Sequence, residues 1–372
     1  MPISSARPTL LWIQALRALA ALVVVWAHTN AETGWFAYYV NKPSELPSFV
    51  TGAAGVDLFF VISGFVMVYS SESLFGSLDG SRTFLIRRLL RIVPLYWLTT
   101  AATLLAWRHF GISWEMQGMG WENLISSLAF VAWPHVGVTE PGWGNTGPIV
   151  AVGWTLFYEM FFYLCFGIAV IARPRVAIIG TAIFLIWFSE YGHSLPLPYP
   201  LIYVANRCLW EFALGLGIAF VWREGLRLPW YVAALLMCAG LGIIIAKSFE
   251  AAEPDRFIYW ALPCALIVLG ASMMPNPSLS SRFWPVATLL GDASYAIYLT
   301  HGIVMMSIRM QWLNFSVWLY QWPWVHAAFI AAASTAVGCL IHVAIERPIT
   351  LLLKRRLARA RDLPAVMVQT AA

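Results

Sequence analysis

The chain is dominated by apolar runs of about 20 residues, the length that crosses a bilayer as a helix. Ten such runs alternate with shorter polar or basic segments. Hydrophobic residues make up 60% of the 372 residues and charged residues only 11%, whereas soluble domains carry about 25% charged residues. We therefore predict an all-α, polytopic membrane bundle of about ten transmembrane helices, near residues 10–29, 52–70, 90–107, 148–172, 175–190, 202–222, 230–246, 257–274, 287–308 and 324–346.

The lysines and arginines set the expected orientation of this bundle. With the N-terminus in the cytoplasm, sixteen of the 23 basic residues fall on the cytoplasmic side and five on the outer side, while Arg17 and Arg207 lie within spans. This bias follows the positive-inside rule. The apolar run 122–133 is too short to cross comfortably, and a crossing there would reverse the bias. We expect both termini in the cytoplasm, with the protein in the plasma (inner) membrane.

The domain organisation is expected to be simple. No internal repeat is visible, and no segment has the length and polarity of a second, soluble domain. Residues 1–350 are predicted to form one membrane-embedded domain, and residues 351–372 a basic cytoplasmic tail that is partly disordered. The net charge of +5 arises from this loop and tail bias, so it does not indicate a nucleic-acid partner.

The first apolar run, "LRALAALVVVWAH", holds two residues that are costly in hydrocarbon, Arg17 and His28. They are eleven positions apart, which is close to three turns of an α-helix. Both side chains are therefore expected on one helix face, about 16 Å apart along the axis. One face of one helix is then able to contact a long molecule at two points. The alternative is that Arg17 only snorkels to the interface and His28 is an ordinary interfacial residue.

Two acidic residues fall within predicted spans. Asp57 lies near the start of "GVDLFFVISGFVMVYS", at the expected depth of His28, where its carboxylate is able to orient the imidazole as the acid of a catalytic triad does. The alternative for Asp57 is a helix N-terminal carboxylate that faces water. Glu159, in "GWTLFYEMFFYL", is expected deep in the bilayer, facing the interior of the bundle and paired with a cation.

A cluster of arginines precedes the third span, in "RTFLIRRLLRIVPLYW". Arg88 and Arg91 are three residues apart and project from the same side of a helix. Guanidinium groups bind phosphate bidentately, so one interpretation is recognition of a phosphate-bearing, nucleotide-like cofactor from the cytoplasm. The other is anchoring against anionic lipid, the commoner role of juxtamembrane arginines.

The cysteines do not indicate a metal site. The five of them, Cys165, Cys208, Cys238, Cys264 and Cys339, lie in apolar stretches without CxxC or Cys/His spacing. We expect buried thiols, no disulfide framework and no metal ion.

Taken in order, these motifs resemble the acyltransferase-3 family of integral-membrane O-acyltransferases, and within it the exopolysaccharide O-acetyltransferases. The resemblance covers roughly residues 10–350. It rests on the arginine–ten residues–histidine pattern of Arg17 and His28, the "GVDLFFVISGF" block, the Arg88–Arg91 element, the "WTLFYE" block with Trp154 and Glu159, the "SYAIYLTH" segment and the terminal "ERP". Each motif alone is weak, whereas their order along a ten-span chain is specific.

The resemblance implies transfer of an acyl group, most often acetyl, from an acyl-CoA co-substrate such as acetyl-CoA to a carbohydrate hydroxyl. Catalysis then falls to His28 as general base, with Asp57 and Glu159 supporting it. An acetyl-histidine intermediate is an open alternative. Residues expected to bind the acyl-CoA are Arg17, Arg88, Arg91, Tyr96 and Trp154.

The sequence leaves two other classes of function open. A transporter or flippase of a polysaccharide or lipid-linked sugar would also place Arg, Asp, Glu and His within spans. It would leave the arginine cluster and the ordered motifs unexplained, and no repeat symmetry supports it. A scaffold for a polysaccharide synthase predicts instead that His28 and Glu159 are dispensable. The sequence does not indicate the oligomeric state.

Overall fold

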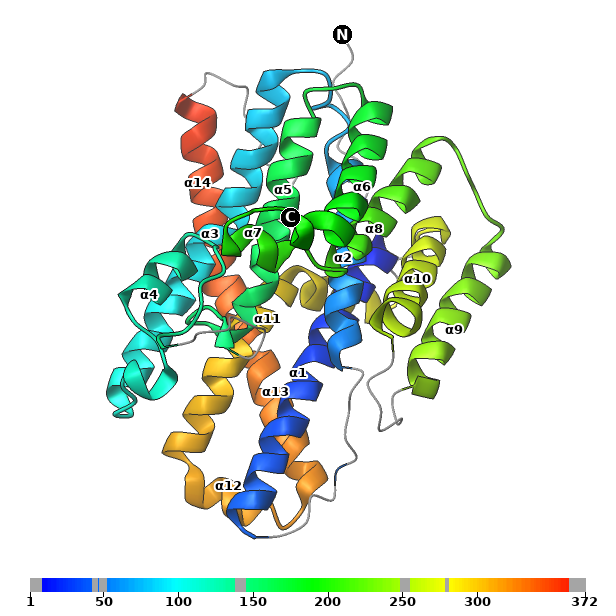
Figure 1. Ribbon diagram of the computed structural model, residues 1–372. Helices are drawn as coiled ribbons and strands as arrows, with labels where there is room; N and C mark the ends of the chain where they lie inside the picture. The colour runs from blue at the N-terminus through cyan, green and yellow to red at the C-terminus, as the bar shows by residue number, and fades with distance from the viewer. Residues whose placement is uncertain are drawn as a thin grey trace.

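The computed structural model describes residues 9–41, 46, 52–137, 145–247, 255–277 and 281–360, and over these ranges the chain is almost entirely helical (Figure 1). They contain no β-strand, only an isolated bridge between Pro134 and Thr146. The longer helices are α1 (Leu11–Tyr39), α2 (Gly52–Ser70), α3 (Leu78–His109), α5 (Trp154–Ala169), α6 (Pro174–Tyr191), α8 (Cys208–Arg223), α9 (Trp230–Lys247), α10 (Leu262–Met273), α11 (Phe283–Gln311), α13 (Pro323–Ile341) and α14 (Arg347–Ala360).

Short elements connect these helices. They are the helices α4 (Trp121–Leu128), α7 (Tyr199–Val204) and α12 (Leu313–Leu319), the 3₁₀ turns η1 (Glu115–Gln117), η3 (Ala151–Gly153) and η4 (Gly192–Ser194), and the π-helical turns η5 (Phe257–Ala261) and η6 (His342–Glu346). The all-α class predicted from the apolar runs is confirmed.

Every one of the ten predicted spans overlaps a helix, although the span 202–222 is broken between α7 and α8. Among the described residues, six helical segments are long and apolar enough to cross a membrane: Leu11–Tyr39, Leu78–His109, Ala151–Ala169, Pro174–Ser194, Trp230–Lys247 and Pro323–Leu357. Ala54–Ser70 and Phe257–Met273 are shorter apolar helices. The chain is a multi-pass membrane protein, and the number of ten spans remains a prediction.

Two regions outside these spans were also predicted. The run 122–133 contains only the 8-residue helix α4, which is too short to cross. The first part of the predicted tail, residues 351–360, continues α14, and residues 361–372 lie outside the described residues.

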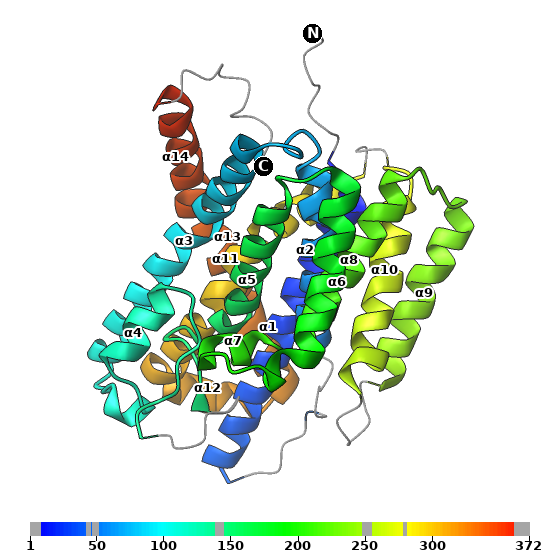
Figure 2. The same cartoon turned by 45° about the horizontal axis from the view of Figure 1, so that its top comes forward.

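Helix α1 occupies the centre of the bundle, where it packs against α2, α11 and α13. Helix α2 packs in turn against α8, and α9 and α10 form a pair at one edge (Figure 2). A methyl group at Gly291 of α11 would overlap the backbone of Gln14 in α1, and one at Gly64 of α2 would overlap the carbonyl oxygen of Phe212 in α8. Glycines therefore set how closely these helices approach, as is usual in membranes.

Helices α1 and α11 run side by side in the same direction, and polar side chains pair along their contact. We call this series the α1–α11 ladder. Its pairs, in order along α1, are Gln14 with Asp292, Arg17 with Ser294, His28 with His301, and Glu32 with Arg309. The residue number of the partner on α11 rises with the residue number on α1, so the two helices run parallel.

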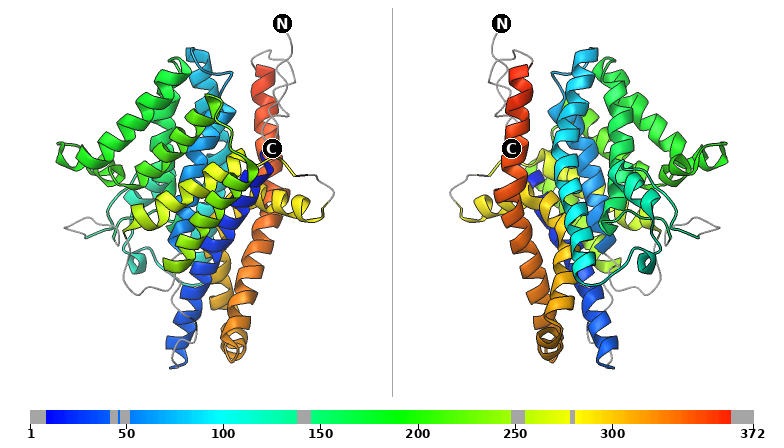
Figure 3. Two further views of the ribbon diagram at one scale, coloured as in Figure 1. Left: turned by 90° about the vertical axis from the view of Figure 1, so that its right-hand side faces the viewer. Right: turned by 90° about the vertical axis from the view of Figure 1, so that its left-hand side faces the viewer.

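Several helices are longer than a bilayer requires. Helices α1 and α11 have 29 residues each, or about 43 Å, against a hydrocarbon core of about 30 Å. Figure 3 shows α14 projecting at one end of the bundle and the last turns of α1 with α12 projecting at the other. We call these the Arg17 end and the α12 end.

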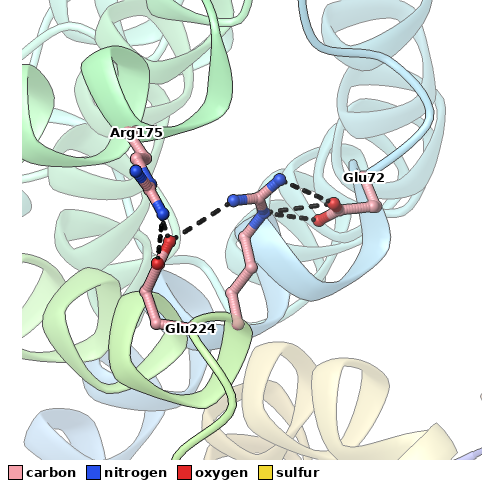
Figure 4. Close-up of polar contacts among 4 residues, drawn as sticks. Glu72, Arg175 and Glu224 are labelled. Atoms are coloured by element: carbon pink, nitrogen blue, oxygen red, sulfur yellow. Dashed lines mark hydrogen bonds and ion pairs between the residues drawn. The ribbon is translucent and has the colours of Figure 1, made fainter.

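A chain of ion pairs at the Arg17 end joins three helix connections (Figure 4). Arg223, which ends α8, contacts Glu72 after α2 (Nη2–Oε1 3.0 Å). Glu224 contacts both Arg223 (3.6 Å) and Arg175 near the start of α6 (2.6 Å). The hydrogen bonds from the Arg175 guanidinium hold the pKa of the Glu224 carboxyl below its usual range. Ion pairs that reach solvent contribute little to the free energy of unfolding, so most of the stability of the bundle comes from the packing of its helices.

The α2–α8 crossing gives a matched test of this packing. A methyl group at Gly215 would overlap the carbonyl oxygen of Val61 in α2, whereas one at Gly217, half a turn on, meets nothing within 4 Å. We expect Gly215→Ala to lower the stability of the purified protein in detergent by about 1–3 kcal/mol. Gly217→Ala is expected to leave it unchanged or slightly raised, because alanine favours the helix. Size-exclusion chromatography after a heating series measures both variants, and equal midpoints would contradict the packing described here.

Candidate functional site

A partly open cavity of about 110 Å³ lies between α1, α2, α3, α5 and α11. Its walls are mostly apolar and come chiefly from α2, with Val56, Phe59, Phe60, Ile62, Val66 and Met67. Its polar lining comprises Arg17, Ser63, Arg91, Thr155, Glu159, Tyr163, Ser294, Tyr295 and Tyr298. An apolar cavity with a few convergent polar groups is the usual form of a small-molecule site.

His28 lies beyond this cavity in a geometry suited to a base. Its Nδ1 lies 2.9 Å from the carbonyl oxygen of Val24, one turn back on α1. A carbonyl oxygen only accepts, so Nδ1 carries the hydrogen and the lone pair is on Nε2. The side chain is exposed rather than packed away. Nε2 of His28 is thus able to accept a proton from a molecule at this position.

A second histidine lies directly beside the first. The rings of His28 and His301 are 4.9 Å apart, edge to face, and His301 is fully buried. Nδ1 of His301 faces the carbonyl oxygen of Ile297 (3.3 Å), and its Nε2 has no hydrogen-bond partner among the described residues. A buried polar atom without a partner costs about 1–3 kcal/mol, so this nitrogen calls for a functional explanation.

One tyrosine joins the histidine pair to the cavity. Tyr298 lines the cavity and its ring lies 6.1 Å from that of His301. Its hydroxyl is held by the carbonyl oxygen of Val152 (2.9 Å) and the hydroxyl of Thr155 (3.0 Å). The cavity therefore ends one aromatic ring away from the two imidazoles.

Arg17 lines the cavity toward the opposite end from the histidines. Its guanidinium donates to Gln14 Oε1 (2.9 Å) and to Ser294 Oγ (3.1 Å). Arg17 and His28 both face α11, so the prediction that they share one face of α1 is confirmed. Arg17 lines the cavity, whereas the residues of α1 between Arg17 and His28 do not.

Glu159 projects into the cavity from α5. Its carboxylate accepts hydrogen bonds from Tyr163 and from Ser63 Oγ (3.4 Å). We expected Glu159 to pair with a cation, and its hydrogen-bond donors are hydroxyl groups instead. The prediction that Glu159 faces the interior of the bundle is confirmed.

The two arginines of α3 that were predicted to bind the acyl-CoA, Arg88 and Arg91, lie in different surroundings. Arg91 lines the cavity. Arg88 donates to Ser70 Oγ (2.6 Å) and its guanidinium carbon lies 5.4 Å from the Phe84 ring centroid and 6.0 Å from that of Tyr163. Arg88 thus packs behind Tyr163 and near Glu159. Its positive charge therefore lies on the side of the cavity that carries Glu159 and Tyr163.

Asp57 does not contact His28, contrary to our expectation. Its carboxylate forms an ion pair with Arg256 (Oδ2–Nη2 2.9 Å), which also contacts Glu211 (3.5 Å). The reason is depth. Helix α2 starts alongside Ala27, and Asp57 is five residues further along it, so the carboxylate lies about 8 Å deeper than expected. Asp57 belongs to a buried ion cluster rather than to the histidine pair.

Two further residues predicted to bind the acyl-CoA lie outside the cavity lining. The hydroxyl of Tyr96 bonds to Ser127 Oγ (2.7 Å), and its ring packs on Phe130, so Tyr96 holds α4 against α3. Trp154 contacts the ring of Tyr158 (6.0 Å). Neither is among the described residues that line the cavity.

His301, Glu211 and Arg256 were not selected from the sequence. His301 stands in the "SYAIYLTH" segment, where a lone histidine more often serves packing. Arg256 follows a polar connection, and only the folded chain brings it to Asp57. The described residues contain no group of three or more His, Cys, Asp or Glu side chains placed to hold a metal ion, and the cysteines are free thiols.

Comparison with known proteins gives one family. A family model described as an acyltransferase domain matches residues 10–343. The exopolysaccharide production protein ExoZ of Rhizobium meliloti is 30% identical over 327 residues, which cover 87% of this chain and 96% of ExoZ. The acyltransferase MdmB of Streptomyces mycarofaciens is 26% identical, covering 92% of each chain. The putative membrane-bound transacylase BcsY of Komagataeibacter xylinus is 27% identical, covering 90% of this chain and 81% of BcsY. No solved structure matches.

The ion cluster of Asp57, Glu211 and Arg256 yields a stability prediction. Replacing the cation leaves two buried carboxylates unpaired, so Arg256→Met is expected to cost about 3–5 kcal/mol. Adding Asp57→Asn removes one of those charges and should recover part of the loss. Thermal unfolding of the purified variants in detergent measures both effects.

Arg207→Met is the matched control, because Arg207 forms an exposed pair with Glu190 (3.4 Å). It should cost less than about 1 kcal/mol. An Arg256→Met protein that unfolds at the temperature of Arg207→Met would show that the cluster does not hold the helices together.

Proposed function

Because the chain belongs to the acyltransferase-3 family, we propose that it moves an acyl group, specifically acetyl, from cytoplasmic acyl-CoA to a hydroxyl of a cell-surface or exported polysaccharide. The observation that carries this proposal is the cavity that leads from Arg17 and Arg91 to Tyr298, next to the histidine pair. The name of ExoZ, an exopolysaccharide production protein, supports an exopolysaccharide as acceptor.

The proposed orientation places the Arg17 end in the cytoplasm. Ten spans with both termini inside, in the plasma membrane, put Arg82, Arg87, Arg88 and Arg91 of α3 and the basic residues of α14 on the cytoplasmic side. The acyl-CoA then enters at the Arg17 end and the acceptor approaches from the α12 end. His28 lies about 16 Å further out along α1 than Arg17.

The residues around the cavity fit an acyl-CoA as co-substrate. Arg17, Arg88 and Arg91 supply the positive charge that its phosphates require. The apolar walls from α2 suit an extended, mostly uncharged arm, whose thioester would reach Tyr298. Tyr96 and Trp154 act behind the cavity wall in this proposal, as supports of α3 and α5 rather than as ligands. No metal ion is required.

The proposed chemistry is general base catalysis at His28. Nε2 of His28 takes the proton of the acceptor hydroxyl as the hydroxyl oxygen forms a bond to the thioester carbonyl carbon. The C–S bond breaks, and the departing thiolate receives the proton from His28. Glu159 organises Ser63 and Tyr163 along the cavity, and Asp57 fixes α2. In the covalent alternative, Nε2 attacks the thioester carbonyl carbon, the C–S bond breaks and the CoA thiolate leaves with the acetyl group on His28; the acceptor hydroxyl oxygen then attacks the acetyl carbon, the N–C bond breaks, and the hydroxyl proton returns to the thiolate.

Labelled acetyl-CoA tests the function directly. Membranes that hold the protein should transfer radiolabelled acetyl groups into a carbohydrate fraction, and membranes without it should not. Absence of label in every carbohydrate fraction, with intact protein, would overturn the proposal and favour transport.

His28→Ala is expected to lower the transfer rate roughly 100- to 10,000-fold, the usual contribution of a general base. Insertion and yield should be unchanged, because the His28 side chain is exposed. His193→Ala, at an exposed position in η4, is the control and should retain full activity. The initial rate of label incorporation is the measurement, and an active His28→Ala protein would refute the assignment.

Arg91→Gln is expected to raise the KM for acetyl-CoA about tenfold, which corresponds to one lost charge-assisted contact. The maximal rate should change little, since Arg91 lies far from the thioester in this proposal. Arg82→Gln, at an exposed position on the same helix, is the control. Equal KM values for the two variants would show that the phosphates of acetyl-CoA do not bind at Arg91.

A further inference from the structure

The face of α1 that carries His28 continues beyond it toward the α12 end. Glu32, Trp35 and Tyr39 follow His28 by four, seven and eleven residues, spacings that return to within about 40° of the same direction. The stripe from His28 to Tyr39 is about 16 Å long. We call these four residues the outer stripe.

The side chains of the outer stripe contact one another and α11. Glu32 Oε2 accepts a hydrogen bond from Arg309 Nη1 (3.1 Å). The Arg309 guanidinium carbon lies 5.1 Å from the ring centroid of Trp35. The rings of Trp35 and Tyr39 stack, with centroids 5.3 Å apart and planes 17° from parallel. One ion pair and two aligned aromatic rings thus form a connected surface on the same face of α1, beyond His28.

The aromatic part of this surface is accessible, whereas the Glu32 side chain is only 13% exposed. The exposed fraction is 38% for Trp35 and 52% for Tyr39, and the Arg309 side chain is 29% exposed. With α1 crossing the hydrocarbon core in about 20 residues from Leu11, the positions beyond Asn30 lie outside the core. The Glu32–Arg309 pair agrees with this, because a stripe that faces lipid tails would not carry an ion pair.

We propose that the outer stripe is the binding surface for the acceptor saccharide, an inference that rests on the proposed function. A sugar ring has one face of C–H groups, which suits the electron-rich face of an aromatic ring, and a rim of hydroxyl groups. The C–H face stacks on Trp35 and Tyr39. The Arg309 guanidinium, fixed by Glu32, donates to the hydroxyl rim. A neighbouring unit of the saccharide then presents its hydroxyl to Nε2 of His28.

This assignment explains why the stripe extends beyond the histidine. Binding of a part of the substrate away from the reacting atoms supplies the free energy that holds the reacting hydroxyl in place. Aromatic platforms at several points suit a repeating chain better than a single small molecule. The acceptor class that follows is a polymeric or oligomeric saccharide that lies along α1 and reaches His28 from the α12 end.

Adjacent tyrosines give a matched test. Tyr39 belongs to the stripe, whereas Tyr38 is 86% exposed and points about 100° away from Tyr39 around α1. The acceptor probe is the carbohydrate fraction that wild-type membranes label from acetyl-CoA and His28→Ala membranes do not. Initial rates are measured at varied concentrations of this fraction, and separately at varied concentrations of acetyl-CoA.

Trp35→Ala and Tyr39→Ala are expected to raise the acceptor concentration for half-maximal rate about tenfold or more, by analogy with other ring-stacking contacts. The KM for acetyl-CoA should be unchanged in both. Trp35→Phe, which keeps an aromatic face, should recover most of the acceptor affinity, and Tyr38→Ala should behave as wild type.

Three outcomes overturn the inference and leave the proposed function standing. One is wild-type acceptor kinetics in Trp35→Ala and Tyr39→Ala. Another is an equal effect of Tyr38→Ala and Tyr39→Ala, which would indicate general anchoring of α1 at the membrane surface. The third is a parallel rise in the KM for acetyl-CoA, which would indicate a distorted bundle. If wild-type membranes label no carbohydrate at all, the proposed function fails, and the inference fails with it.

Discussion

A polar side chain within a membrane needs a partner on another helix, and this requirement organises the bundle around α1. Helix α1 carries Arg17 and His28 within its membrane-crossing part and Glu32 just beyond it, all on one side, and each has a partner on α11. The α1–α11 ladder fixes both the direction of α11 and its register against α1. Gly291 permits the close contact by leaving room for the backbone of Gln14. Without this pairing, α1 would expose costly groups to lipid, and the cavity would lose one of its walls.

The ladder also gives the candidate site its two ends. Arg17 lies at one end of the cavity and the histidine pair lies just past the other, so a single pair of helices holds both the charge that would bind phosphates and the base that would accept a proton. The other walls are fixed separately. Asp57, Glu211 and Arg256 join α2 to α8 and to the start of α10 in a buried cluster away from His28. The cluster of Asp57, Glu211 and Arg256 holds the cavity walls in place, whereas the α1–α11 ladder positions Arg17 and His28.

Local periodicity explains what the sequence could predict. The number of residues between Arg17 and His28 is enough to place them on one face, and the lengths of the apolar runs are enough to place the helices. The inward direction of Glu159 follows from the cost of a carboxylate in lipid. The depth of one helix against another does not follow from such patterns. It depends on where glycines such as Gly55 and Gly64 let backbones touch, and so the partner of Asp57 was missed. His301 was passed over for a related reason, because its significance lies in a ring on another helix.

The most direct test of this acyl-CoA site is a structure of the His28→Ala protein with acetyl-CoA, determined by electron cryomicroscopy in a lipid nanodisc. We expect density for the phosphates beside Arg88 and Arg91, an extended arm along the α2 wall of the cavity, and the thioester close to Tyr298 and His301. Density for acetyl-CoA outside this cavity, or phosphates at the α12 end, would show that the donor binds elsewhere.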